Sequence, residues 1–145
     1  MKIHNIQLNS SINIQNINLA IGNFDGLHLG HQKIIKKLIH HSSEMKIDSC
    51  IMSFLPHPRQ FFSGKNDNFK ILSEELKIKL LKQIGVNHYF VLNFDQSIAS
   101  LTPKEFIEII LVKKLMIKNL VVGYDFKFGK DRKGNVSLLK DQSLI

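Results

Sequence analysis

Residues 22–31 read GNFDGLHLGH, and this segment constrains the fold more than any other part of the chain. It holds three glycines, one carboxylate and two histidines within ten residues. A short apolar run at residues 17–21 precedes it, and a run with apolar residues at helical spacing follows it. The segment therefore predicts a glycine-rich turn that leads from a buried strand into a helix.

Such a turn is suited to hold a phosphate group. Glycines allow sharp turns and close approach of a ligand, and the first turn of a helix offers unpaired N–H groups and the positive end of its dipole. His28 and His31 are three residues apart, so both rings can face one bound group there. A His-x-x-His pair alone is weak evidence, and His40 and His41 on the same helix receive no role. The glycine spacing matches neither the dinucleotide fingerprint nor a P-loop.

The rest of the chain alternates between strand-like and helix-like segments. Strands are predicted at residues 17–21, 49–54, 89–92 and 120–122, after a leading strand or loose arm in residues 1–16. Helices are predicted at residues 31–43, 73–83 and 103–114, with another starting near residue 135. Residues 56–70 are predicted to form a long loop, because Pro56 and Pro58 interrupt the strand pattern.

Three helix boundaries are marked by local chemistry. Ser73 is expected to cap the second helix and Gly85 to end it. Thr102 and Glu105 have the spacing of a capping box, with Pro103 at the first helical position.

Alternation of strands and helices predicts an α/β fold with a mostly parallel sheet flanked by helices and right-handed crossovers. A chain of 145 residues suits one domain, so we treat residues 1–145 as a single unit. Ligands of such folds bind beyond the carboxyl ends of the strands. The turns after the strands at 17–21, 49–54 and 120–122 should therefore meet at one edge of the sheet.

The formal charge of +8 does not by itself predict a nucleic-acid partner, because the lysines are scattered along the chain. Of the 20 basic residues only Arg59 and Arg132 are arginines, and both lie in candidate site loops. The guanidinium group binds phosphate through two parallel hydrogen bonds, so this placement favours anionic ligands at those loops. We expect no nucleic acid as partner.

Cys50 is the single cysteine and lies in a strand-like run, where a small buried side chain is the expected role. No apolar run approaches the roughly 18 residues needed to cross a bilayer, and the N-terminus lacks the pattern of a signal peptide. These features predict a cytoplasmic protein without a membrane partner. The oligomeric state is not predicted.

Residues 22–31 resemble the signature of the nucleotidylyltransferase superfamily, whose core is His-x-Gly-His. The longer form, Gly-x-Phe-Asp-Gly-x-His-x-Gly-His, is similar to the FMN adenylyltransferase module of bacterial bifunctional riboflavin kinase/FAD synthetases. The sequence PHPR at residues 56–59 resembles the Pro-His-Pro loop of that family, and VGYDFKFG at residues 122–129 resembles its Gly-x-Asp-Phe-x-Phe-Gly segment. The resemblance extends from Asn18 to Leu139 and implies a Rossmann-like nucleotidylyltransferase fold.

The resemblance implies adenylyl transfer from ATP to FMN, giving FAD and pyrophosphate, with Mg²⁺ accompanying ATP. His28 and His31 would be the catalytic residues that contact the ATP phosphates, with His28 nearest the α-phosphate. The other residues implied in ATP binding are Gly22, Asn23, Phe24, Asp25, Gly26, Gly30, Asp125 and Arg132. The residues implied in FMN binding are His57, Pro58, Arg59, Phe62, Phe106 and Phe128.

Several of these residues also have structural interpretations. Asp25 could equally order the glycine turn through a local hydrogen bond to the backbone. Asp125 is the candidate for a contact with Mg²⁺ or with ribose, since Mg²⁺ needs only one or two carboxylates besides phosphate oxygens. Phe106 lies on the apolar face of a predicted helix and on periodicity fits the core better than a ligand slot. Phe62 and Phe128 fit either role.

The chain departs from the family pattern in two ways. We find no Ser-Ser/Thr-x-x-Arg segment at a later helix start, and no riboflavin kinase module. The domain is therefore expected to be C-terminally incomplete, either as a fragment or as a shortened protein, and loss of phosphate donors would slow the reaction. Alternatives are a weakened flavin- or ATP-binding remnant, or a nucleotidylyltransferase for another phosphorylated acceptor such as a pantetheine or nicotinamide mononucleotide.

Overall fold

The computed structural model describes residues 1–64 and 71–142. Its strands are β1 (Lys2–Ile6), β2 (Asn18–Ile21), β3 (Ser49–Leu55), β4 (His88–Asn93) and β5 (Asn119–Val121). Its longer helices are α1 (Leu29–Met45), α3 (Glu74–Ile84) and the π-helical η2 (Phe106–Lys114), which continues directly from α5 (Pro103–Glu105). The short helices are η1 (Asp25–Leu27), α2 (Pro58–Ser63), α4 (Gln96–Ala99), η3 (Lys130–Arg132) and α6 (Val136–Asp141).

The five strands form one parallel sheet in the order β1-β4-β3-β2-β5. The predicted α/β class and parallel sheet are thus confirmed. From β2 the chain moves outward through β3 to β4, and then returns to place β5 on the other side of β2. The direction of winding therefore reverses between β2 and β5, which is where open α/β sheets bind their ligands.

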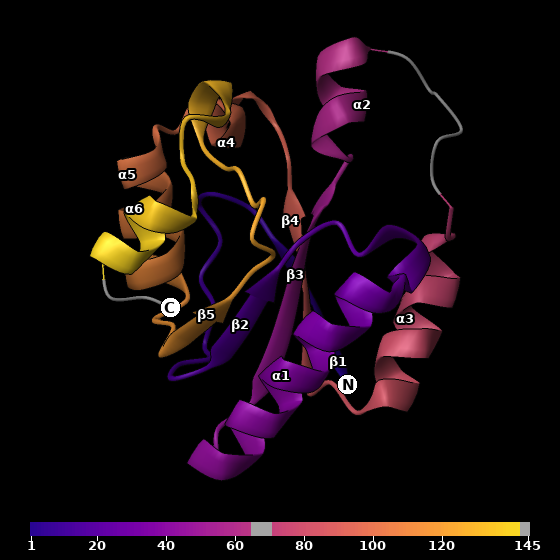
Figure 1. Cartoon of the computed structure of the whole chain (residues 1–145). Coiled ribbons are helices and arrows are strands. Elements are labelled where there is room, and N and C mark those ends of the chain that lie inside the picture. The colour runs from indigo at the N-terminus through magenta and orange to yellow at the C-terminus, as the bar shows by residue number, and fades with distance from the viewer. Residues whose placement is uncertain (65–70, 143–145) are drawn as a thin grey trace.

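Helices cover both faces of the sheet (Figure 1), with α1 and α3 on one side and α5, η2 and α6 on the other. Because side chains alternate along a strand, each strand supplies both cores. In β4, for example, Tyr89 and Val91 pack toward α1 and α3, whereas Phe90 and Leu92 pack toward η2. All four residues of β2 are buried, as expected for the central strand of a parallel sheet covered on both faces.

The predicted caps are present. The Ser73 side chain accepts the N–H of Leu76, and Gly85 ends α3 in a left-handed conformation. The helix expected to start near residue 135 is α6, and the Asn135 side chain, which was not predicted as a cap, accepts the N–H of Leu138. At α5, Thr102 and Glu105 form the full capping box.

Two parts of the predicted pattern are wrong. Within the region predicted as a loop, α2 forms because Pro58 occupies a first-turn position, where its missing N–H costs nothing, and the His57 side chain accepts the N–H of Arg59. The short helix α4, capped by Asp95, was not predicted at all. The expected loop also included Phe69, which lies outside the described residues.

Among the described residues, no helix has both the length and the apolar character that crossing a bilayer requires.

The capping box at α5 gives a test of the fold. In Thr102→Ala, the N–H of Glu105 loses its acceptor, which lies at 3.2 Å, so the free energy of unfolding should fall by about 1 kcal/mol. Urea unfolding followed by circular dichroism measures this change. The exposed neighbour Lys104 provides the control, because Lys104→Ala should stay within about 0.5 kcal/mol of the parent. Equal stability of the two variants would show that the cap is not stabilising.

Candidate functional site

The turn after β2 is shaped by one buried ring and one left-handed glycine. Phe24 is fully buried in the core beneath α1, although its backbone is left-handed (φ 50°). Gly26 also has positive φ (74°), a conformation that favours glycine. Gly30 serves a different purpose, since a Cβ there would lie 3.2 Å from ring atoms of His28. Of the three glycines in this turn, only Gly26 therefore adopts the left-handed backbone conformation that favours glycine.

The two histidines of this turn are stacked on each other at the start of α1. Their ring centroids lie 3.7 Å apart, with His28 exposed and His31 partly buried against the Phe24 ring. Burial, together with the nearby His28, lowers the pKa of His31 below its ordinary value despite the opposing charges of Asp25 and Asp125. The lowered pKa favours the neutral ring of His31, in which one nitrogen can accept a hydrogen bond while the other donates.

Two buried polar atoms of the turn, Nδ1 of His31 and Oδ1 of Asn23, have no hydrogen-bond partner among the described residues. Buried polar atoms are nearly always paired, so such exceptions need an explanation. A ligand or water that binds the turn would provide the missing partners. The structure thus brings together His28, His31 and Asn23 in a way that suits a bound polar group.

Asp25 links the turn to the beginning of α3. Its carboxylate accepts the backbone N–H groups of Ile71 at 2.9 Å and of Leu72 at 3.0 Å. Partial burial raises the pKa of Asp25, but these N–H groups outweigh that effect and hold the pKa below its ordinary value. These contacts support the structural interpretation of Asp25, although over a longer range than the local hydrogen bond expected from sequence.

A buried ionic network next to the turn was missed by the sequence analysis. Lys77 of α3 is only 8% exposed and pairs with Glu74 at 3.3 Å. The Tyr89 hydroxyl donates to the other oxygen of Glu74 and also contacts the Ser53 hydroxyl. Burial and the bond to Glu74 raise the pKa of Tyr89. Two sequence features could have indicated this network, namely a Glu-x-x-Lys pair at helical spacing and a tyrosine in an apolar strand.

This network borders a small cavity whose lining includes Asn23, Asp25, His57 and Lys77. The cavity joins the glycine turn to the Pro-His-Pro segment after β3, as expected for turns at one sheet edge. The side chain of Lys77 brings a positive charge close to both Asp25 and His31. We therefore add Lys77 to the residues of the candidate site.

The aromatic residues predicted for the flavin lie in two different environments. Phe62 of α2 is 70% exposed and forms a cluster with Phe61 and Phe94. Phe106 and Phe128, in contrast, are 3% and 5% exposed and contact each other in the core beneath η2. In Figure 1, α2 and α5 stand on opposite sides of the carboxyl ends of the strands. The structure therefore does not bring these three rings together.

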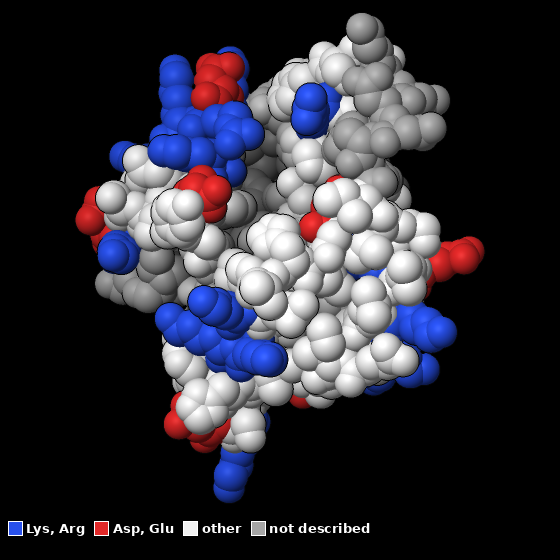
Figure 2. Space-filling view, turned by 45° about the vertical axis from the view of Figure 1, so that its right-hand side comes forward, with Lys and Arg blue, Asp and Glu red and all other residues white. Residues whose placement is uncertain are grey.

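The loop after β5 carries the remaining predicted residues. Asp125 is exposed and close enough to His31 to influence its pKa, so it lies near the histidine turn. Arg132 in η3 is exposed, as is Arg59 in α2. Figure 2 shows this end of the molecule as a hollow between two lobes. The described residues contain no group of three or more His, Cys, Asp or Glu side chains that could hold a metal ion.

A family model described as FAD synthetase matches residues 11–144. "Bifunctional riboflavin kinase/FMN adenylyltransferase" from Buchnera aphidicola (strain Sg) is 37% identical over 96% of the chain, and the Haemophilus influenzae protein of the same name is 38% identical over 90%. The chain spans only 43% and 42% of the length of these two relatives.

A solved structure described as a macrolide-efflux protein from Streptococcus pneumoniae superimposes with a TM-score of 0.86 at 25% sequence identity. The match covers 97% of this chain and 55% of that one.

Replacement of Asp25 tests the link between the turn and α3. In Asp25→Asn, the amides of Ile71 and Leu72 lose a charged acceptor, so their hydrogen exchange should accelerate about five- to tenfold, equivalent to about 1–1.4 kcal/mol. Asp125→Asn is the control and should leave both amides unchanged.

The same link should depend on pH. Because the pKa of Asp25 is lowered in the folded protein, the protection is complete well above the ordinary value of 3.8 and is lost as the pH falls through the lowered pKa. Exchange of these two amides that is equal in the parent and in Asp25→Asn would contradict this interpretation.

Proposed function

The chain belongs to the FAD synthetase family, and on this premise we propose that it transfers the adenylyl group of ATP to FMN. In this reaction, a phosphate oxygen of FMN attacks the α-phosphorus of ATP and pyrophosphate leaves, so FAD is formed. The attacking oxygen already carries negative charge, and no covalent intermediate with the protein is needed. The rate then depends on alignment of the two phosphates and on stabilisation of charge.

The stacked histidines with an unpaired buried nitrogen are the observation that best supports this proposal. His28 is exposed beside the first turn of α1, where it can donate to the phosphate at which charge develops. His31 is held by Phe24 and can complete its hydrogen bonding through Nδ1 when the nucleotide binds. The N–H groups at the start of α1 add to the attraction for phosphate.

The remaining ATP contacts are assigned to Gly22, Asn23, Gly26, Gly30, Asp125 and Arg132 in this proposal. Phe24 acts from beneath the turn, and Asp25 and Lys77 fix its geometry. Mg²⁺ bound to ATP would neutralise phosphate charge. The donor set fits a cation carried by the nucleotide, because Asp125 supplies a single exposed carboxylate near the histidines and Mg²⁺ commonly takes its other ligands from phosphates and water.

For FMN, we propose His57, Pro58 and Arg59 at the phosphate end and the exposed ring of Phe62 against the flavin. Phe106 and Phe128 would support the site from the core, since both rings are buried. Small nucleotides rather than nucleic acid are the proposed partners. The face drawn in Figure 2 supports this choice, because its basic side chains form separate groups with uncharged surface between them.

His28→Ala should lower the rate of FAD formation by about a hundredfold or more, through loss of one positioned donor. FAD formation from FMN and MgATP is measured under single-turnover conditions with the protein in excess, so that a slow reaction is still detected. The control is His40→Ala on the same helix, because the side chain of His40 is 71% exposed and belongs to no site. If the two variants react equally fast, His28 has no part in the chemistry.

Phe62 and Phe128 form a matched pair for the flavin contact. Phe62→Ala should weaken FMN binding by about 0.5–1.5 kcal/mol with little loss of stability, because this ring is exposed. Phe128→Ala should instead lower the free energy of unfolding by about 3–5 kcal/mol. Quenching of FMN fluorescence and urea unfolding measure the two effects. Unchanged FMN affinity in Phe62→Ala would remove this ring from the proposed slot.

A further inference from the structure

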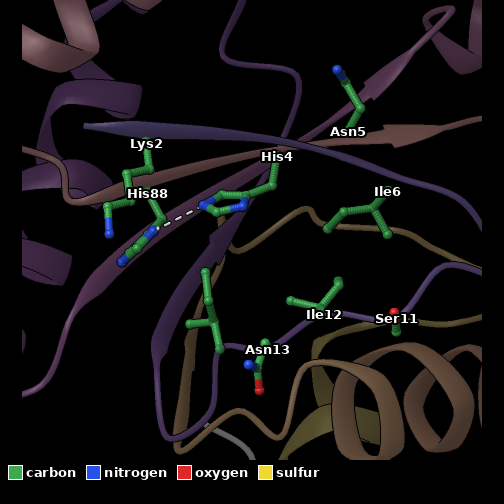
Figure 3. A pocket seen from close by; sticks show the side chains of 9 residues that line it. Lys2, His4, Asn5, Ile6, Ser11, Ile12, Asn13 and His88 are labelled. Atoms are coloured by element: carbon green, nitrogen blue, oxygen red, sulfur yellow. Dashed lines mark hydrogen bonds between the residues drawn. The ribbon is translucent and has the colours of Figure 1, made fainter.

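A second cavity lies far from the histidine turn, beside the edge strand β1. Its volume is about 450 Å³, and its walls come from β1, from residues 11–14 and from the first residue of β4. Figure 3 shows His4 at one side of this cavity, with Ile6 and Ile12 across from it. The proposed nucleotide site uses none of these residues.

His4 is the end of a hydrogen-bonded chain of three ionisable groups. Nε2 of His4 lies 3.0 Å from Nδ1 of His88, and Nε2 of His88 lies 2.9 Å from Oδ2 of Asp48. The centroids of the two rings are 5.2 Å apart, so the rings meet almost head-on and one proton lies between the facing nitrogens. His88 is buried, which fixes the middle of the chain.

The order of donors and acceptors along these hydrogen bonds follows from the Asp48 carboxylate, which can only accept a hydrogen bond when it is ionised. The Nε2 of His88 therefore donates to Asp48, and in the singly protonated ring its Nδ1 accepts the Nε2–H of His4. The Nδ1 of neutral His4 is then left with a lone pair. In Figure 3 this second ring nitrogen is turned away from His88 toward the cavity. A proton can be taken up at this nitrogen without breaking the hydrogen bonds to His88 and Asp48.

The cavity combines a positively charged end with an apolar side. Its lining includes Lys2, the two histidines and three isoleucines, together with the uncharged polar residues Asn5, Ser11 and Asn13. Among the described residues, no Asp or Glu lines it. From η2, Lys114 donates to the Ser10 carbonyl next to the cavity wall. Burial, His88 and Lys2 together lower the pKa of His4 from its ordinary value of 6.5, so the free cavity favours neutral His4. A bound anion would reverse this balance.

We propose that this cavity binds a small organic anion, a carboxylate with an apolar body, and that His4 takes up a proton when the anion binds. The carboxylate would accept the new Nδ1–H of His4, and the aliphatic part would pack against Ile6, Ile12 and Ile14. The site is separate from the proposed adenylyl-transfer site and does not depend on that activity.

The test uses pentanoate as the probe and pentanamide as its neutral analogue. Histidine NMR signals and calorimetry in two buffers of different ionisation enthalpy are measured on the full chain from pH 6 to pH 8. We expect pentanoate to shift the His4 signals and to bind with uptake of up to one proton. Its affinity should be at least about tenfold higher at pH 6 than at pH 8. Pentanamide should bind more weakly and without pH dependence.

Two variants complete the design. His4→Phe keeps an aromatic ring but removes the base, and should abolish both pentanoate binding and proton uptake. His40→Ala/His41→Ala is the matched control on α1 and should behave as the parent. Pentanoate binding that is absent, independent of pH, or retained in His4→Phe would overturn the proposal. The pH and pentanamide comparisons decide the question even if His4→Phe does not fold.

Discussion

The buried central strand β2 is the constraint on which the rest of this molecule depends. It pairs in parallel with both β3 and β5, and none of its side chains reaches solvent. Parallel strands need crossover connections, and here these connections cover both faces of the sheet. Every strand consequently ends at the same edge. The glycine turn, the Pro-His-Pro segment and the loop after β5 converge there because of the pairing inside the sheet.

The candidate site depends on a second layer of support behind its exposed groups. Phe24 fills the core beneath the turn, and its ring packs against the ring of His31. The Lys77, Glu74 and Tyr89 network places a buried positive charge beside the same turn. The contacts among Phe24, His31 and His28 are thus present without a bound ligand. Such preorganisation matters most for a reaction whose catalysis consists of positioning and electrostatics.

Local sequence signals predicted the strands, the capped helices and the parallel fold, because each rests on neighbouring residues. The same signals could not separate a proline that interrupts a strand from one that starts a helix, and so α2 was missed. They also could not show that Phe128 packs on Phe106, because this contact joins segments that are far apart in the chain. Lys77 escaped notice for the same reason, since its importance arises only where α3 meets the turn.

The carboxylate of Asp25 accepts hydrogen bonds from the backbone N–H groups of residues 71–72, so this contact does not depend on which side chains these residues carry. A clamp of this kind leaves the clamped segment free to change in sequence during evolution, as long as the course of its backbone is kept. Covariation between aligned positions would give no sign of the contact, because any residue except proline supplies the same donor. An invariant acidic residue without a co-varying partner is therefore the trace that such an interaction leaves in a family.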